Sequence, residues 1–196
     1  MRDNFSVPGT RERGATLIEV LVTIMILTFA LLGVAALQVS MQRAQAESYH
    51  RSHAVLLLQD MVDRVNANRN NALDYVTPGA LGAGNTVEDC TGLSDAALDL
   101  CEWNNALMGT AESTASGQTA GGMIDARGCI ASVDATMPRE FVVAVTWRGL
   151  VPTVAPSFTT CGQGLYGNER MRRALVARVT IGCLQNEPAT GLCVTP

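Results

Sequence analysis

The 196-residue sequence contains no lysine and only two histidines, and these absences restrict what the chain can do. Its formal net charge is −4, and between Asp74 and Glu140 ten acidic residues stand against two arginines. A surface with this charge repels nucleic-acid phosphates, so we expect no nucleic-acid partner. The scarcity of histidine also leaves few candidates for a general base or a nitrogen ligand to a metal.

Motifs that carry catalysis are missing as well. The sequence has no G-x-S-x-G, no H-E-x-x-H and no P-loop. Gly162-Gln-Gly-Leu-Tyr-Gly167 matches the dinucleotide pattern G-x-G-x-x-G, but Pro152 and Pro156 precede it and a strand-like run follows closely. A nucleotide site needs a strand before this motif and a helix after it, so we interpret the segment as a turn-forming loop.

Isolated titratable residues do not combine into a site. His50 and His53 lie three residues apart, but no third metal ligand is near in sequence, so we expect a solvated or subunit-facing surface there. We interpret acids such as Asp95 and Asp99 as helix caps and surface charge. We therefore expect no enzyme, no cofactor and no metal site, and a membrane-anchored periplasmic enzyme is the least favoured alternative.

Proline is absent from Gly9 to Thr77, which permits one long helix from Ala15 to about Asn68. Residues 15–37 carry a single charge, Glu19, and are apolar on all faces. A helix of this length measures roughly 34 Å, enough to cross a hydrocarbon core of about 30 Å. The pattern predicts a membrane helix over residues 15–37.

The helix changes character over residues 38–71. Its apolar positions recur at steps of three and four and alternate with polar ones, which predicts an amphipathic half that packs against a domain. These positions are Val55, Leu58, Met61, Val62 and Val65. An asparagine-rich cluster at residues 66–71, followed by Pro78-Gly79, predicts the end of the helix.

Two simpler anchors compete with this interpretation. A secretory signal could end at Gly33-Val34-Ala35, and a plain single-pass anchor would also be apolar. The apolar run is longer than a signal requires, and a charge inside it costs free energy that neither anchor needs to bear. Glu19 thus points to a further role.

The string Gly14-Ala15-Thr16-Leu17-Ile18-Glu19-Val20-Leu21-Val22 resembles the class III signal of type IV pilins and of type II secretion pseudopilins. The resemblance implies that residues 1–14 are a leader, which a prepilin peptidase removes between Gly14 and Ala15. It also implies N-methylation of Ala15, although this family usually has Phe at that position. Glu19 then becomes the fifth residue of the mature chain.

The chemistry of Glu19 can be argued from charge alone. Cleavage after Gly14 creates an ammonium group at the membrane edge, and a carboxylate four residues further on can pair with it, on the same helix or on a neighbouring one. The intermolecular pair would set the register in which subunits assemble. The alternative is that Glu19 merely extends to the lipid headgroups.

Six cysteines lie beyond the membrane helix, an even number that indicates disulfides in an oxidising compartment. Six cysteines allow fifteen connectivities. We expect Cys90 to pair with Cys101 and Cys183 with Cys193 as local loops, which leaves Cys129 and Cys161.

Residues 72–196 form the expected head. Ser94-Asp95 predicts a helix start with a stop at Gly109, and Trp103 is a candidate core residue. Residues 77–88 and 112–122 have loop compositions, the latter flexible. Three β-branched runs at 128–133, 140–147 and 174–182 predict an antiparallel sheet, which the striped half of the helix would cover. The expected fold class is therefore α+β, as the pilin resemblance also implies.

The arginines at 170, 172, 173 and 178 are interpreted as a solvated approach to the last strand.

Short matches at Cys101-Glu-Trp103 and Val145-Thr-Trp147 resemble minor pilins of the PilV type. This implies a subunit that primes or modifies pilus assembly, with a place near the pilus tip. The partners would be the prepilin peptidase, other minor pilins, the major pilin and an inner-membrane assembly platform. The chain would span the inner membrane once, with its head in the periplasm, and reach the cell surface after assembly. A minor pseudopilin of a type II secretion system shares these features, and an adhesive or regulatory head is a further alternative.

Overall fold

The computed structural model describes residues 14–110, 122–133, 140–182, 185–186 and 193–194. The chain divides into two compact units, here called the stalk (Met1–Ala44) and the head (Gln45–Pro196). The described elements are α1 (Leu17–Ala67), the 3-10 helix η1 (Arg69–Tyr75), β1 (Leu81–Gly82), α2 (Asp95–Leu107), β2 (Arg127–Ser132), β3 (Glu140–Arg148), the 3-10 helix η3 (Glu169–Met171), β4 (Arg172–Thr180), β5 (Gln185–Asn186) and β6 (Cys193–Val194).

The long helix is present as expected and contains 51 residues. Its apolar stretch has few polar side chains, and two of them are satisfied within the helix. The hydroxyl of Thr23 donates to the carbonyl of Val20 at 2.8 Å, and that of Thr28 donates to the carbonyl of Met25 at 2.7 Å. These bonds lower the cost of placing a hydroxyl in an apolar surrounding.

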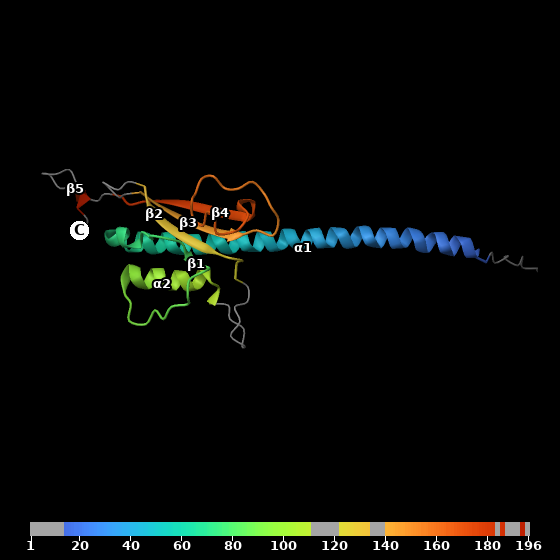
Figure 1. Ribbon diagram of the computed structural model, residues 1–196, viewed down its shortest axis with the longest axis horizontal. Coiled ribbons are helices and arrows are strands. Elements are labelled where there is room, and N and C mark those ends of the chain that lie inside the picture. The colour runs from blue at the N-terminus through green and yellow to red at the C-terminus, as the bar shows by residue number, and fades with distance from the viewer. Residues whose placement is uncertain (1–13, 111–121, 134–139, 183–184, 187–192, 195–196) are drawn as a thin grey trace, which may run out of the picture. The chain divides into compact units, whose positions relative to one another are not determined.

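The head contains a four-stranded antiparallel sheet in the order β1-β2-β3-β4 (Figure 1). The three predicted strands are confirmed with ends shifted by at most two residues. In β2 and the first half of β3, alternate side chains such as Ile130, Phe141 and Val143 are buried. Residues 143–147 of β3 are all buried, so both faces of this strand are covered there. β1 lies in the segment that we expected to be loop. It is two residues long and exists only through pairing with β2, so no local pattern announces it.

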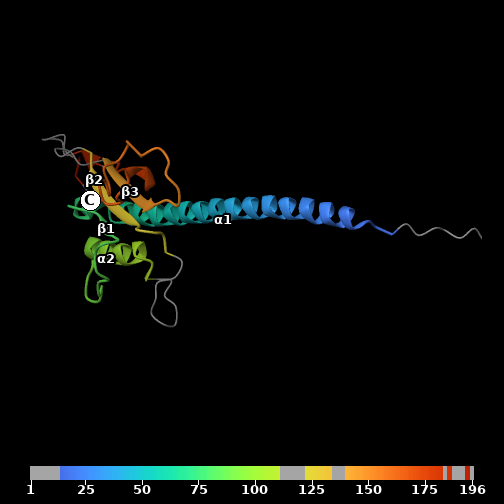
Figure 2. The same cartoon turned by 45° about the vertical axis from the view of Figure 1, so that its right-hand side comes forward.

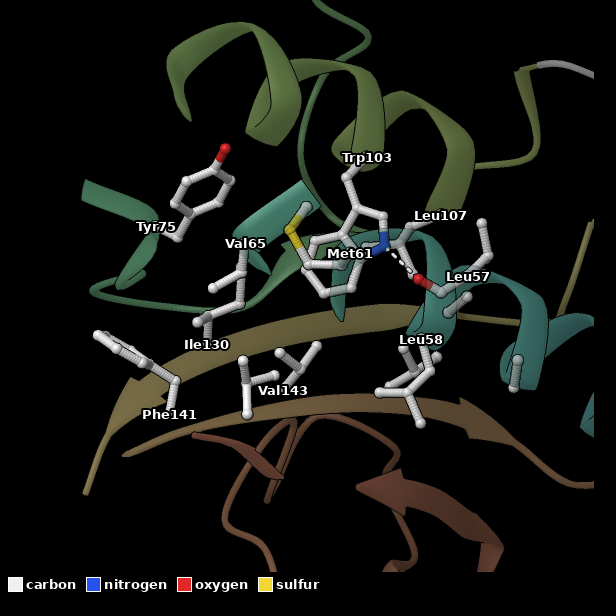
Figure 3. Packing of buried hydrophobic residues seen from close by; sticks show 14 of the residues in the cluster. Leu57, Leu58, Met61, Val65, Tyr75, Trp103, Leu107, Ile130, Phe141 and Val143 are labelled. Carbon is white, nitrogen blue, oxygen red and sulfur yellow. Dashed lines mark hydrogen bonds between the residues drawn. The ribbon is translucent and has the colours of Figure 1, made fainter. Parts of the chain in front are cut away.

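The head part of α1 lies between α2 and the sheet (Figures 1 and 2). Its buried stripe comprises Ala54, Leu57, Leu58, Met61 and Val65, which share one core with the inward side chains of the sheet. Trp103 of α2 is fully buried in this core, as expected, and its indole nitrogen donates to the carbonyl oxygen of Leu57 at 3.0 Å (Figure 3). One apolar face of α1 therefore organises two layers of the head, which confirms the α+β fold class.

Two expectations fall partly or wholly outside the described residues. The flexible segment predicted at 112–122 overlaps residues 111–121, and the expected partner Cys183 is also outside them. At the carboxyl end, β5 and β6 pair as a separate two-stranded antiparallel sheet.

Candidate functional site

The resemblance to a processing signal centres on the start of α1. Residues 14–16 precede the helix, and the carbonyl oxygen of Thr16 accepts the amide hydrogens of Glu19 at 3.0 Å and Val20 at 3.3 Å. Glu19 lies in the first helical turn and is exposed. A carboxylate is favoured at this position because the amino end of a helix carries partial positive charge.

Gly14 has no role that the fold can explain. A Cβ added at this residue would meet no atom within 4 Å, and its backbone is not in the left-handed region. The folded chain could therefore accept another residue here. A requirement for glycine at this position would have to come from another molecule that binds the segment.

The apolar part of α1 is exposed on all sides. Large apolar side chains from Leu17 to Met41 are 46–83% exposed. Among the described residues, α1 is the one helix long and apolar enough to cross a membrane. So much apolar surface requires lipid or other helices around it.

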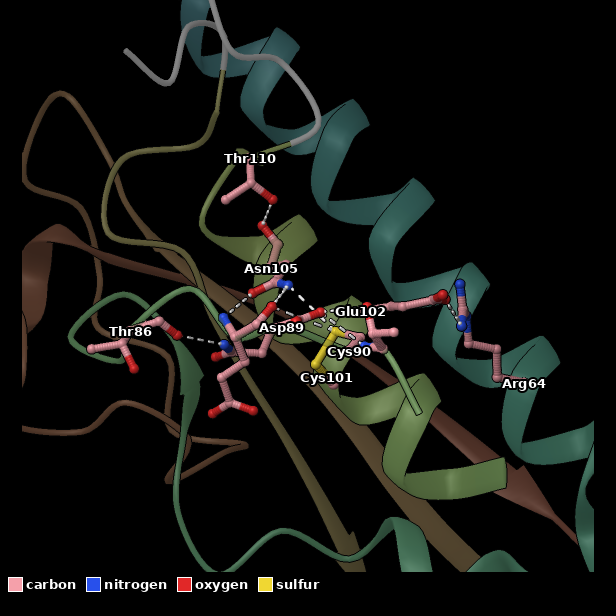
Figure 4. Close-up of a disulfide and its surroundings, with 11 residues drawn as sticks. Arg64, Thr86, Asp89, Cys90, Cys101, Glu102, Asn105 and Thr110 are labelled. Carbon is pink, nitrogen blue, oxygen red and sulfur yellow. Dashed lines mark hydrogen bonds and ion pairs between the residues drawn. A yellow bond between two sulfur atoms is a disulfide. The ribbon is translucent and has the colours of Figure 1, made fainter. Parts of the chain in front are cut away.

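At the other end of α1, Arg64 joins the helix to α2. Its guanidinium pairs with Asp60 of the same helix at 3.1 Å and with Asp99 and Glu102 of α2 at 2.7 Å each; Figure 4 draws the pair with Glu102. Burial alone would lower the pKa of Arg64, but the hydrogen bonds that its guanidinium donates to Glu102, Asp99 and Asp60 outweigh this effect and raise the pKa. The arginine thus bridges α1 and α2 through its ion pairs with Asp99 and Glu102.

Tyr75 completes this network from η1. Its hydroxyl bonds to the carboxylate of Asp99, and burial together with that bond raises the pKa of Tyr75 to about 12. Asp99 was expected to be surface charge, but its side chain is only 22% exposed. The interpretation failed because Asp99 is on the face of α2 that meets α1, where an arginine stands opposite.

Two disulfides stabilise the loops of the head. Cys90 pairs with Cys101, which ties the segment before α2 to the helix itself (Figure 4), and Cys129 of β2 pairs with Cys161. No cysteine is free among the residues that the structure describes. The pairing of Cys183 with Cys193 remains an expectation.

The two histidines are less exposed than expected. His50 is 9% exposed, and burial, reinforced by nearby His53, lowers its pKa although Glu47 acts in the opposite direction. The Nδ1 atoms of both histidines are buried without a hydrogen-bond partner. Of the two expected alternatives, a solvated or a subunit-facing surface, the solvated one is wrong for His50, because its side chain is buried. Within the described residues no three metal-ligating side chains gather.

The arginine cluster at 170–178, most of which lies in β4, also differs from expectation. Arg170 and Arg178 are exposed, but Arg172 is only 2% exposed, and its Nε donates to Glu169 at 2.7 Å. The carboxylate of Glu169 accepts a hydrogen bond from the amide of Gly164 as well, and these two bonds lower its pKa. Arg172 was misassigned because its burial is caused by a loop that folds back over β4.

Two positioning residues were not singled out from the sequence. Buried Asn104 accepts the amide hydrogen of Gly82 at 2.8 Å and donates to the carbonyl of Thr86 at 3.1 Å, which anchors β1 to α2. Glu47 on α1 accepts from Arg173 at 2.6 Å. The sequence contained one indication for Asn104, a polar residue at a position where the helix pattern expects an apolar one. It contained no indication for Glu47. The residues 162–167 form turns, as expected for this glycine-rich segment.

An exposed, membrane-length apolar helix that continues into an α+β head defines a pilin-like protein. Residues 9–35 match the model of the prokaryotic N-terminal methylation motif, and residues 36–115 match the family model described as type IV pilin Tt1218. The two matches adjoin, and together they support a type IV pilin. No curated protein and no solved structure matches it.

Proposed function

We propose that this pilin subunit is a minor pilin that is cleaved after Gly14 and helps to prime or modify pilus assembly near the tip. The observation that carries the proposal is the segment from Gly14 to Glu19 at the amino end of an exposed apolar helix. The unexplained Gly14 supports recognition by the prepilin peptidase. The PilV-like details support a minor role, and so does the head, in which three of the six described strands (β1, β5 and β6) are only two residues long.

Residues 1–14 act as the leader and residues 15–37 as the membrane and fibre-core part of the helix. Residues 38–71 form its amphipathic half, and residues 72–196 form the remainder of the head, which faces the periplasm before assembly. Ala15 is the residue that becomes methylated. Other minor pilins, the major pilin and an inner-membrane assembly platform are the partners.

Assembly moves the apolar helix from lipid into a bundle of similar helices. The hydrophobic contribution changes little in this transfer, so packing and polar contacts select the register. The exposed carboxylate of Glu19 pairs with the terminal ammonium of a neighbouring subunit. Charges are poorly screened in an apolar bundle, so this pair is strong, and a subunit displaced along the axis would leave both charges buried without a partner.

The processing step is tested with Gly14→Phe. The variant should remain in the membrane as a longer chain that retains residues 1–14, whereas Gly33→Ala, another site where a Cβ meets no atom, should be processed normally. Intact mass and N-terminal sequencing of the membrane-extracted protein decide the result. A mature N-terminus in Gly14→Phe would refute the processing site.

The register role is tested with Glu19→Ala. Export and cleavage should be nearly unchanged, but the amount of the chain in sheared fibres should fall. Glu12→Ala, which removes an acid from the leader, is the matched control and should not alter incorporation. Normal incorporation of Glu19→Ala would contradict the pairing.

A minor pseudopilin of a type II secretion system is the second candidate, because the processing signal serves both systems. Deletion of the chain separates the two. Loss of surface pili with normal protein secretion supports the minor pilin, and loss of secretion with normal pili supports the pseudopilin.

A further inference from the structure

The loop between β3 and η3, residues 149–168, contains no charged residue and is here called the neutral loop. Several of its apolar side chains face solvent. Val154 is 90% exposed, Phe158 64%, Leu165 54% and Val151 43%. Apolar side chains gathered in one segment of a charged head indicate an interaction surface.

The backbone of the neutral loop is held by three arginines. Arg170, Arg172 and Arg173 direct their guanidinium groups at its carbonyl oxygens. The acceptors, at 2.7–3.2 Å, are Val151, Thr153, Pro156, Thr159 and Cys161. These cations are therefore occupied by backbone, and the loop presents apolar side chains.

The loop is also tied to the rest of the head at two points. Glu47 of α1 accepts hydrogen bonds from Arg173 at 2.6 Å and from the amide of Leu150 at 3.2 Å. Further along the loop, Cys161 is linked to Cys129 of β2 by a disulfide. A surface ordered before contact loses little conformational entropy on binding, which favours association.

A groove of about 370 Å³ runs along this surface. Residues 154–158 of the neutral loop and residues 172–174 at the start of β4 form its walls. Its volume lies within the range of pockets that admit a small ligand, so it can accept apolar side chains projecting from a helix.

We propose that the neutral loop is the docking surface for the apolar stalk helix of a neighbouring pilin subunit. The inference rests on the proposed function, because it requires a subunit that assembles. Residues 20–42 of this chain are uncharged, and a stalk of that kind matches the neutral loop in charge and polarity. The head surface around α2 carries exposed acids such as Glu88, Asp95 and Glu102. If that surface docked on the neutral loop, these carboxylates would lose their water, which costs free energy. A loop-to-stalk contact joins two different surfaces and can repeat along a fibre.

The partner is identified by placing the photo-reactive residue benzoylphenylalanine at Val154 in cells that assemble fibres. Illumination should cross-link it to residues 20–42 of a neighbouring copy or to the corresponding apolar helix of another pilin, as mapped by mass spectrometry. The same residue at Val87, an apolar position 61% exposed elsewhere in the head, is the control and should not give this product. Cross-links from Val154 to a head surface, a lipid or a protein other than a pilin, or none at all from fibres containing the chain, would overturn the proposal.

Charge substitution gives an independent test. Val154→Asp should lower the amount of the chain in sheared fibres about tenfold, the effect of losing one strong contact, while Val87→Asp should not. Retention of the Cys129–Cys161 disulfide and of protease resistance checks that the head is folded, and a misfolded variant leaves the decision to the cross-links. If the wild-type chain is absent from fibres, the proposed function fails. If wild-type and Val154→Asp chains are incorporated equally, only the docking surface fails.

Discussion

Gly128 lies beneath the ring of Trp103, where a side chain has no room. A Cβ at this residue would be 2.2 Å from Cη2 and 2.5 Å from Cζ3 of the indole, and 2.8 Å from Cδ1 of Leu107. The ring is fully buried and is held by its bond to Leu57, so it cannot move aside without loss of packing. The absence of one methyl group on β2 thus allows α2 to approach the sheet.

Gly128→Ala should lower the free energy of unfolding by about 1–3 kcal/mol, the usual cost of overpacking a core. Gly79→Ala, where a Cβ meets no atom and the backbone is not left-handed, should have little effect. Urea unfolding of detergent-solubilised protein can be followed by tryptophan fluorescence, because Trp103 and Trp147 are both buried in the head. Equal midpoints for the two variants would contradict this account of Gly128.

Tyr75 should make the head sensitive to alkali. Burial and the bond to Asp99 raise its pKa to about 12 from 10.0, so the folded state keeps the phenolic proton that the unfolded state releases. Its contribution to stability is fully present below pH 10 and is lost as the pH rises towards 12, by on the order of 2 kcal/mol.

Tyr75→Phe tests this directly. The variant should be less stable than wild type at pH 8, because Asp99 loses a partner, and its stability should fall less steeply between pH 10 and 12. Urea unfolding at a series of pH values measures both quantities. A slope equal to that of wild type would show that Tyr75 ionises alike in both states.

At the scale of elements, the two described disulfides close loops of different length. Cys90 and Cys101 are separated by 11 residues in sequence, and Cys129 and Cys161 by 32. The loss of chain entropy in the unfolded state predicts contributions of about 3 and about 4 kcal/mol respectively. The longer link also attaches the neutral loop to β2.

Replacing Cys129 and Cys161 by serine should therefore destabilise the head more than the same change at Cys90 and Cys101. Thermal unfolding of the two double variants, with each remaining disulfide verified by mass spectrometry, provides the comparison. The reverse order would indicate that packing around the bonds, not the length of the loop, determines their contribution.

The helices and long strands could be predicted from sequence because each has a local pattern. The period of the apolar residues changes from helical to strand-like after α2, and Gly109 is left-handed as a helix stop requires. β1 could not be predicted, since a strand of two residues depends on its partner. The packing of α1 on the sheet followed from its striped half together with three strands that needed cover, whereas the placement of α2 on the other side of α1 was not predicted.

The candidate site was only partly accessible from sequence. The segment from Gly14 to Glu19 is recognisable because its signal is contiguous. The interactions of Glu47 and Arg172 are not, because each depends on how a loop without regular structure returns to the head. Asn104 illustrates the same limit, as its amide is satisfied by backbone groups 18 and 22 residues away in sequence.

At the scale of the whole molecule, the division into stalk and head predicts independent folding. The core of the head contains buried residues from Ala54 to Val179 and none from the stalk. The fragment 45–196 should therefore fold without the stalk, with both described disulfides formed. Its unfolding, monitored by tryptophan fluorescence, should be cooperative and should match that of the full chain; a gradual transition would show that the head depends on the apolar helix.

The way in which Arg172 and its neighbours are used has a consequence for the durability of a fibre. Their guanidinium groups bind carbonyl oxygens and Glu169 within the subunit, and the neutral loop that they hold has only uncharged groups. A contact made through such a surface contains no ion pair for dissolved salt to screen. Fibres whose subunits are joined through this surface should retain them from low to high salt concentration. Mild detergent should release the subunits more readily than high ionic strength does.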